Sequence, residues 1–132
     1  MNKLFYPAIF ESDENGAYTV EFPDIPGCIT GGDNMESSYE MAFDALGLVL
    51  SHMIDNKEPI PKPSNPQDIP LEPTQFLVVI EFDMVTYKKK HNAKAVKKTL
   101  TIPEWLNEEA TLLGVNFSQV LQEALIQKIR SN

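Results

Sequence analysis

The sequence predicts an α+β protein of two modules, and three features of the 132-residue chain support this prediction. The first third alternates apolar and polar residues in short runs typical of strands, and a long helical pattern follows. Six prolines between residues 57 and 74 then separate this helix from another strand. After residue 87 the charge changes sign, and a strand and two helices are expected. The predicted order is βββαβ followed by strand-helix-helix.

Two strands and a hairpin open the N-terminal module. Residues 4–11 and 17–22 carry the aromatic and β-branched side chains that favour strands. The turn-forming sequence SDENG lies between them and suits a hairpin. Alternate residues of the second strand, starting at Tyr18, share the face that is expected to be buried. A short third strand fits the sequence GCIT at residues 27–30.

A long amphipathic helix follows, with its start expected within residues 34–38. Asn34 is a suitable N-cap, and Ser37 with Glu40 has the spacing of a capping box one turn later. The apolar residues of this helix recur at the spacing of one buried face. They are Tyr39, Ala42, Phe43, Leu46, Val49, Leu50 and Met53.

The remaining segments define the predicted modules. Proline lacks the N–H that helices and sheets need, so residues 57–74 are expected to form an extended connector within the first module. Residues 75–87 are predicted to be a strand that completes this module, which spans residues 1–87. The lysine-rich residues 88–95 are predicted to be a basic linker. The second module is then residues 96–132.

The C-terminal module begins with a lysine-containing strand at residues 96–102. A short helix is expected over residues 104–113, and Gly114 is expected to end it. Ser118 is a candidate cap for a second helix that continues to Ile129. A single strand with two short helices is too small to bury a core alone, so the module is expected to dimerise.

Composition limits the possible functions. The net charge of −8 divides into −12 for residues 1–86 (3 basic, 15 acidic) and +4 for residues 87–132 (8 basic, 4 acidic). The first part suits a basic protein partner, and the second part suits phosphate. Cys28 is the single cysteine, and no cysteine or histidine cluster has zinc spacing. No apolar run is long enough to span a bilayer, so a cytoplasmic protein without cofactors is expected.

The C-terminal pattern resembles the ribbon-helix-helix fold of bacterial and phage repressors, in the strand, Pro103, the helix, Gly114 and the second helix. The resemblance implies a homodimer or higher oligomer whose paired strands enter the major groove of operator DNA. The implied DNA-binding residues are Lys97, Thr99 and Thr101 on the strand, Lys94 before it, and Asn116 and Ser118 at the second helix. The implied dimer core is Leu100, Ile102, Trp105, Leu106, Leu113, Leu121 and Leu125.

The N-terminal module is similar to that of HicB-type antitoxins. The matching residues are Tyr18, Val20, the run Phe22-Pro23-Asp24-Ile25-Pro26-Gly27-Cys28, Thr30, Gly32, Asp33, Glu36, Ala42, Leu46 and the later PIPKPS. The resemblance implies a partial RNase H-like fold. It also implies a partner, a HicA-like toxin that cleaves mRNA. The antitoxin would neutralise this toxin and repress the operon that encodes both proteins. The expected toxin contacts are Glu11, Asp13 and Glu14 in the hairpin, and Asp24 and Ile25 in the following loop.

Two other classes of function remain open at this point. One is a free-standing repressor whose N-terminal module binds a small ligand or only oligomerises. The other is a metal-dependent nuclease, because two-metal nucleases need carboxylates on neighbouring strands. The candidates for that site are Glu11, Glu21, Asp24, Glu81 and Asp83, and none of them forms a pair with distinctive spacing. The prediction is therefore a protein that is not an enzyme.

Overall fold

The computed structural model describes residues 3–131, and these residues divide into two compact units. The first unit is Lys3–Tyr87, hereafter the head. The second unit begins at Lys88 and is described to residue 131, hereafter the tail.

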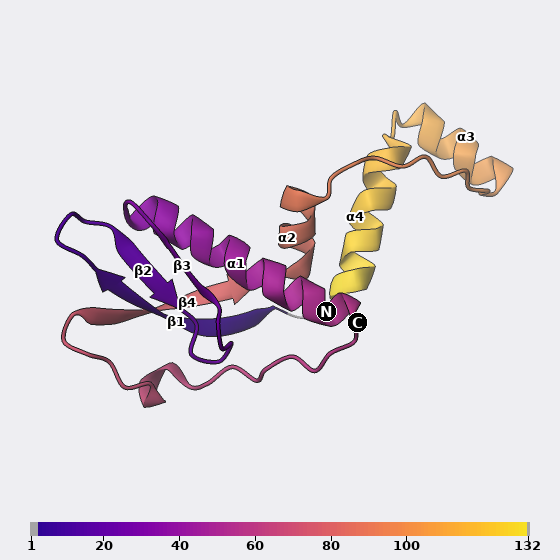
Figure 1. Cartoon of the computed structure of the whole chain (residues 1–132). Coiled ribbons are helices and arrows are strands. Elements are labelled where there is room, and N and C mark those ends of the chain that lie inside the picture. Colours follow the sequence, from indigo (N-terminus) through magenta and orange to yellow (C-terminus); the bar gives the residue numbers. More distant parts are fainter. Residues whose placement is uncertain (1–2, 132) are drawn as a thin grey trace. The chain divides into compact units, whose positions relative to one another are not determined.

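The head contains a four-stranded antiparallel sheet in the order β3-β2-β1-β4 (Figure 1). Its strands are β1 (Leu4–Ser12), β2 (Tyr18–Glu21), β3 (Ile29–Gly32) and β4 (Gln75–Phe82). The predicted hairpin is confirmed, with Phe10 of β1 opposite Val20 of β2. The short third strand is also confirmed, although it begins at Ile29, two residues later than predicted, and it pairs with β2. The sheet therefore has two edge strands, β3 and β4.

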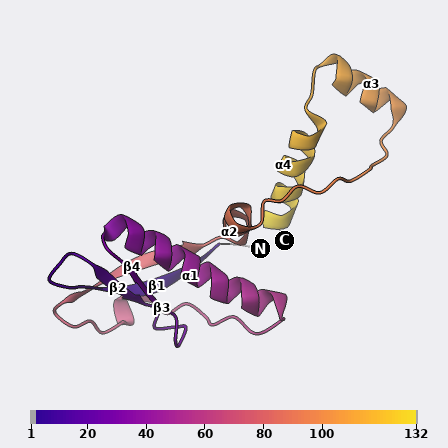
Figure 2. The same ribbon diagram turned by 45° about the horizontal axis from the view of Figure 1, so that its top comes forward.

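Helix α1 (Met35–Asp55) covers one face of this sheet, as both ribbon views show (Figures 1 and 2). The predicted cap Asn34 is confirmed, because its side chain accepts a hydrogen bond from the Ser37 N–H at 2.8 Å. The predicted capping box of Ser37 with Glu40 is wrong. The box is formed by Asn34 and Ser37, because the Ser37 Oγ accepts in turn from the Asn34 N–H. The sheet and helix enclose the core, which includes Tyr6, Phe10, Val20, Phe22, Leu46, Leu50, Ile80 and Phe82.

The predicted last strand of the head is too long. Strand β4 ends at Phe82, and residues 84–91 form helix α2 (Met84–His91). The buried Asp83 carboxylate starts this helix by accepting bonds from the Val85 N–H and the Thr86 hydroxyl. The Tyr87 ring packs against Gly47 of α1, where an added Cβ would lie only 2.1 Å from the ring. Helical backbone carries Tyr87 to this site, so tertiary packing overrides the strand-like sequence.

The proline-rich connector has no strand, as expected. It contains one short 3-10 helix, η1 (Pro66–Asp68), and returns from the end of α1 to the start of β4 (Figure 1). Polar contacts to other parts of the head fix its path. The Tyr6 hydroxyl donates to the Pro61 carbonyl at 2.6 Å, and the Ser64 N–H donates to the Asp24 carboxylate at 2.9 Å.

The tail contains helices α3 (Glu104–Leu112) and α4 (Phe117–Arg130), which confirms both predicted helices. Gly114 follows α3 with a φ of 71°, a conformation that favours glycine. The predicted cap at Ser118 is wrong by two residues. Asn116 caps α4 instead, and its side chain accepts from the Gln119 N–H at 3.1 Å.

Residues 92–103 contain neither helix nor strand, so the predicted strand at residues 96–102 is absent from the single chain. A β-strand needs a hydrogen-bonded neighbour, and the described tail offers none. None of the residues from Lys88 to Ser131 is buried, although many are large and apolar. The tail therefore has no hydrophobic core of its own.

Candidate functional site

The lysine-rich segment ahead of α3 is fully accessible in the single chain. The side chains proposed to contact DNA from this segment, Lys94, Lys97, Thr99 and Thr101, are all exposed. Their intervening apolar neighbours Leu100 and Ile102 are also exposed. The alternation of polar and apolar residues is therefore present in the sequence, but no partner covers the apolar side.

The start of α4 combines a cap with an exposed helix N-terminus. The Asn116 side chain is occupied by its bond to the Gln119 N–H, and the Ser118 hydroxyl accepts from the Gln122 side chain at 3.1 Å. Both residues remain exposed. Backbone N–H groups at a helix N-terminus attract anions such as phosphate. Asn116 and Ser118 thus shape this helix end, and the backbone supplies the donors.

The apolar residues of the tail form an uncovered set. Trp105 is 65% exposed and Leu113 is 82% exposed, values that are unusual for side chains of this size. The other residues expected in a dimer core are also exposed or half-buried. They are Leu100, Ile102, Leu106, Leu121 and Leu125. Single exposed apolar residues are common, but here none of the described residues of the module is buried.

The hairpin acids of the head differ in their local roles. The Asp13 carboxylate accepts bonds from the Asn15 and Ala17 N–H groups at 2.8 and 3.0 Å, so it shapes the turn. Glu11 accepts a bond from the Thr74 hydroxyl at 2.9 Å, which joins β1 to the start of β4. Glu14 is exposed at the tip of the hairpin. All three carboxylates are exposed.

The loop between β2 and β3 is a structural clamp. Ile25 is only 2% exposed, so its side chain belongs to the core and is not available to a toxin in this conformation. The Asp24 carboxylate accepts bonds from both the N–H and the hydroxyl of Ser64, which hold the connector. Burial, and then the nearby Asp24 charge, raise the pKa of Tyr6. The clamp was not predicted because its two halves are 40 residues apart.

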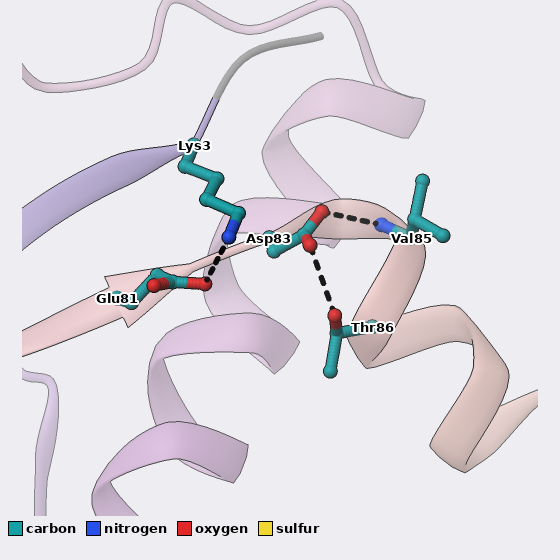
Figure 3. Close-up of polar contacts among 5 residues, drawn as sticks. All are labelled: Lys3, Glu81, Asp83, Val85 and Thr86. Carbon is teal, nitrogen blue, oxygen red and sulfur yellow. Dashed lines mark hydrogen bonds and ion pairs between the residues drawn. The ribbon is translucent and has the colours of Figure 1, made fainter. Parts of the chain in front are cut away.

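Four of the five carboxylates considered for a nuclease site have structural partners, and Glu21 is exposed on β2. The Glu81 carboxylate lies 3.4 Å from the Lys3 ammonium, and Asp83 caps α2 (Figure 3). Glu11 and Asp24 bind the hydroxyls described above. Within residues 3–131 no three histidine, cysteine or carboxylate side chains are grouped as metal ligands would be. Burial raises the pKa of the Cys28 thiol, which does not favour the nucleophilic thiolate.

One exposed surface was not singled out from the sequence. Leu48 is 64% exposed and Met41 is 46% exposed, and both lie on α1. A shallow cavity of about 330 Å³ adjoins Leu48 and is also lined by Val49, His52, Met53 and Glu58. The sequence does contain a signal for this surface, because Met41 and Leu48 are seven residues apart and lie outside the predicted buried face of the helix.

Comparison with known proteins identifies relatives for most of the chain. The family described as "HicB_like antitoxin of bacterial toxin-antitoxin system" matches residues 6–124. The antitoxin HicB 1 of Photorhabdus laumondii is 41% identical over 63 residues, which cover 48% of this chain and 41% of that protein. The chain thus matches less than half the length of this curated relative.

Solved structures give matches over longer segments. A toxin–antitoxin complex from Streptococcus pneumoniae contains a chain 26% identical to this one, with a TM-score of 0.60. The match covers 96% of this chain and 99% of that chain. A HicA3 and HicB3 toxin–antitoxin complex contains a chain with 23% identity and a TM-score of 0.50, covering 61% of this chain and 99% of that chain. Among the described residues, no helix is long and apolar enough to cross a membrane.

Proposed function

Because the chain belongs to the HicB-like antitoxin family of bacterial toxin–antitoxin systems, we propose that it neutralises a HicA-like toxin and represses its own operon. The observation that carries the proposal is the difference between its two units. The head has a core and an acidic surface, whereas the tail is basic and has no buried residue. In this proposal the protein acts in the cytoplasm by binding, without catalysis.

The head is the proposed toxin-binding unit, with a partial RNase H-like fold. A toxin that cleaves mRNA must bind a polyanion, so it carries a basic surface. The acidic head is complementary to such a surface. The structural relatives that occur in toxin–antitoxin complexes support this assignment, and one of those complexes contains HicA3. Glu11, Asp13, Glu14 and Asp24 remain candidate contacts on the head.

The tail is the proposed ribbon-helix-helix module. Two copies would pair residues 96–102 as antiparallel strands and bury the exposed apolar residues of α3 and α4 between them. This arrangement would supply both the missing strand partner and the missing core. It would also place Lys97, Thr99 and Thr101 on the outer face of the paired strands, where they could reach base edges in the major groove.

Co-expression with the product of the adjacent gene tests the proposed toxin binding. We expect a stable complex by pull-down and light scattering, and relief of the growth inhibition that the neighbouring protein causes when expressed alone. A neighbouring protein that neither binds nor inhibits growth would contradict the antitoxin role. The chain would then be better described as a free-standing repressor.

Binding to the promoter region of the operon tests the role of the tail. The double change Lys97→Ala with Thr99→Ala should weaken operator binding and leave toxin binding intact, because both side chains lie outside the head. A matched control is Glu104→Ala, an exposed change at the start of α3. If the double variant bound the operator as tightly as the wild type, the predicted strand would not be part of the DNA interface.

A further inference from the structure

Helix α1 carries a second apolar stripe on the side away from the core. Met41, Ala45, Leu48 and His52 follow each other at intervals of four, three and four residues, so they align along one side of the helix. The buried side of the same helix is formed by Ala42, Leu46 and Leu50. Solvent-facing positions of a helix are usually polar, and leucine and methionine there require an explanation.

A cavity extends this stripe at its C-terminal end. Leu48 and His52 line it together with the half-buried Val49 and Met53 and with Glu58. The cavity is about 330 Å³, large enough for an apolar side chain of a partner. The exposed surface of α1 thus combines an apolar ridge with a recess beside it.

The charge beside the stripe has one sign. Residues 35–56 contain four acids and no lysine or arginine. Glu36, Glu40 and Asp44 are spaced by four residues and therefore form a row next to Met41 and Leu48. A basic protein that presents an apolar side chain fits this surface. A second copy of the head fits it poorly, because it would bring two acidic rows together.

We propose that this surface, defined by Met41, Ala45, Leu48, His52 and the cavity beside them, is the docking site for the basic toxin. The inference rests on the proposed function and places the toxin on α1, in preference to the hairpin and loop carboxylates that the sequence suggested. Apolar contacts from Leu48 and the cavity would supply the buried centre of the interface. The acidic row would guide association and form the polar rim.

The experiment measures binding of the full-length chain to the purified product of the adjacent gene by titration calorimetry. Leu48→Ser should weaken binding by about tenfold or more, because a central interface leucine is removed. The matched control is Ile29→Ser. Ile29 is 60% exposed, close to the 64% of Leu48, and it lies opposite Glu21 on the sheet face away from α1. The control should bind like the wild type.

A charge pair sharpens the test. Leu48→Glu and Leu48→Lys remove the same apolar contact but differ in charge. The lysine variant should bind more weakly, and the difference should shrink at high salt, because the expected partner is basic. The reverse order would contradict the assignment of a basic partner to this surface.

The remaining outcomes separate the possible failures. Loss of binding in Ile29→Ser but not in Leu48→Ser would place the toxin on the open face of the sheet and overturn the inference. The Leu48→Ser antitoxin, measured without toxin, could instead form a smaller oligomer than the wild type while its toxin affinity is unchanged. This result would assign the stripe to contacts between antitoxin copies and would also overturn the inference. If the wild type fails to bind at all, the proposed function falls and this inference falls with it. Thermal unfolding should be similar in all variants, since both positions are exposed.

Discussion

The head and the tail bury apolar residues to very different extents. All the buried residues among positions 3–131 lie in the head, where α1 packs on the sheet. The tail has two regular helices, of which α4 is capped by Asn116, and a glycine ends α3. All its apolar side chains nevertheless remain exposed or half-buried. Local signals are therefore sufficient to form helices, but they do not provide a core. The head completes its own core, whereas the proposed dimer would supply the burial that the tail lacks.

The largest expected effect comes from the centre of the head. Phe10→Ala should lower the free energy of unfolding of the head by about 3–5 kcal/mol, because it leaves a cavity. Phe10 is fully buried and its ring lies 5.5 Å from Phe76 and 6.1 Å from Tyr18. Urea denaturation followed by circular dichroism measures the change. The same substitution in the tail, Phe117→Ala, should leave the head transition unchanged, and an equal loss would mean that the two units unfold together.

A leucine of α4 should matter for association and not for the fold of the head. Leu125 is about half-exposed in the single chain. If it becomes buried between two copies, Leu125→Ala should cost each copy about 2–5 kcal/mol of association energy and shift the protein towards monomer. Light scattering over a concentration series measures this shift. Gln127→Ala, two residues further along α4, is the control, and equal masses for all three proteins would contradict a dimer core that includes Leu125.

A smaller effect is expected where Tyr87 packs against α1 within the head. Gly47→Ala places a methyl group against the Tyr87 ring and should destabilise the head by about 1–3 kcal/mol. The ring of Phe43, 6.3 Å away, limits how far Tyr87 can move. In a Tyr87→Ala background the same glycine change should cost much less. An identical cost in both backgrounds would show that the clash with Tyr87 is not its cause.

The smallest effect concerns pH and the connector. Burial raises the pKa of Tyr6, so its phenol is harder to ionise in the folded state than in the unfolded chain. Its contribution to stability is present below pH 10 and is lost as the pH rises above about 10. Tyr6→Phe should lose about 0.5–1.5 kcal/mol near pH 7, from the bond to Pro61, but should decline less steeply at alkaline pH. Parallel unfolding curves from pH 7 to 11 would show that Tyr6 does not carry this dependence.

Most elements of the head could be predicted from local pattern. Alternation identified the hairpin at residues 4–22, because one strand face packs on the helix and the other faces solvent. Asn34 marked the start of α1 because its short side chain satisfies a helix N–H. The charge division between residues 1–86 and 87–132 also needed only the sequence. These features depend on neighbours within a few residues, or on composition.

Other features depended on contacts between distant segments. Residues 84–87 were predicted to be strand from their sequence, but they are helical, and the Tyr87 ring packs against Gly47 of α1. Ile25 was expected to contact the toxin, yet its side chain lies in the core. Helix α1 has apolar residues on more than one side. The sheet covers only one side, so Met41 and Leu48 remain exposed. The sequence by itself determined which segments form helices and most of the strands, since those depend on local backbone preferences. Only the tertiary structure decided which apolar side chains are buried, because burial depends on what packs against them.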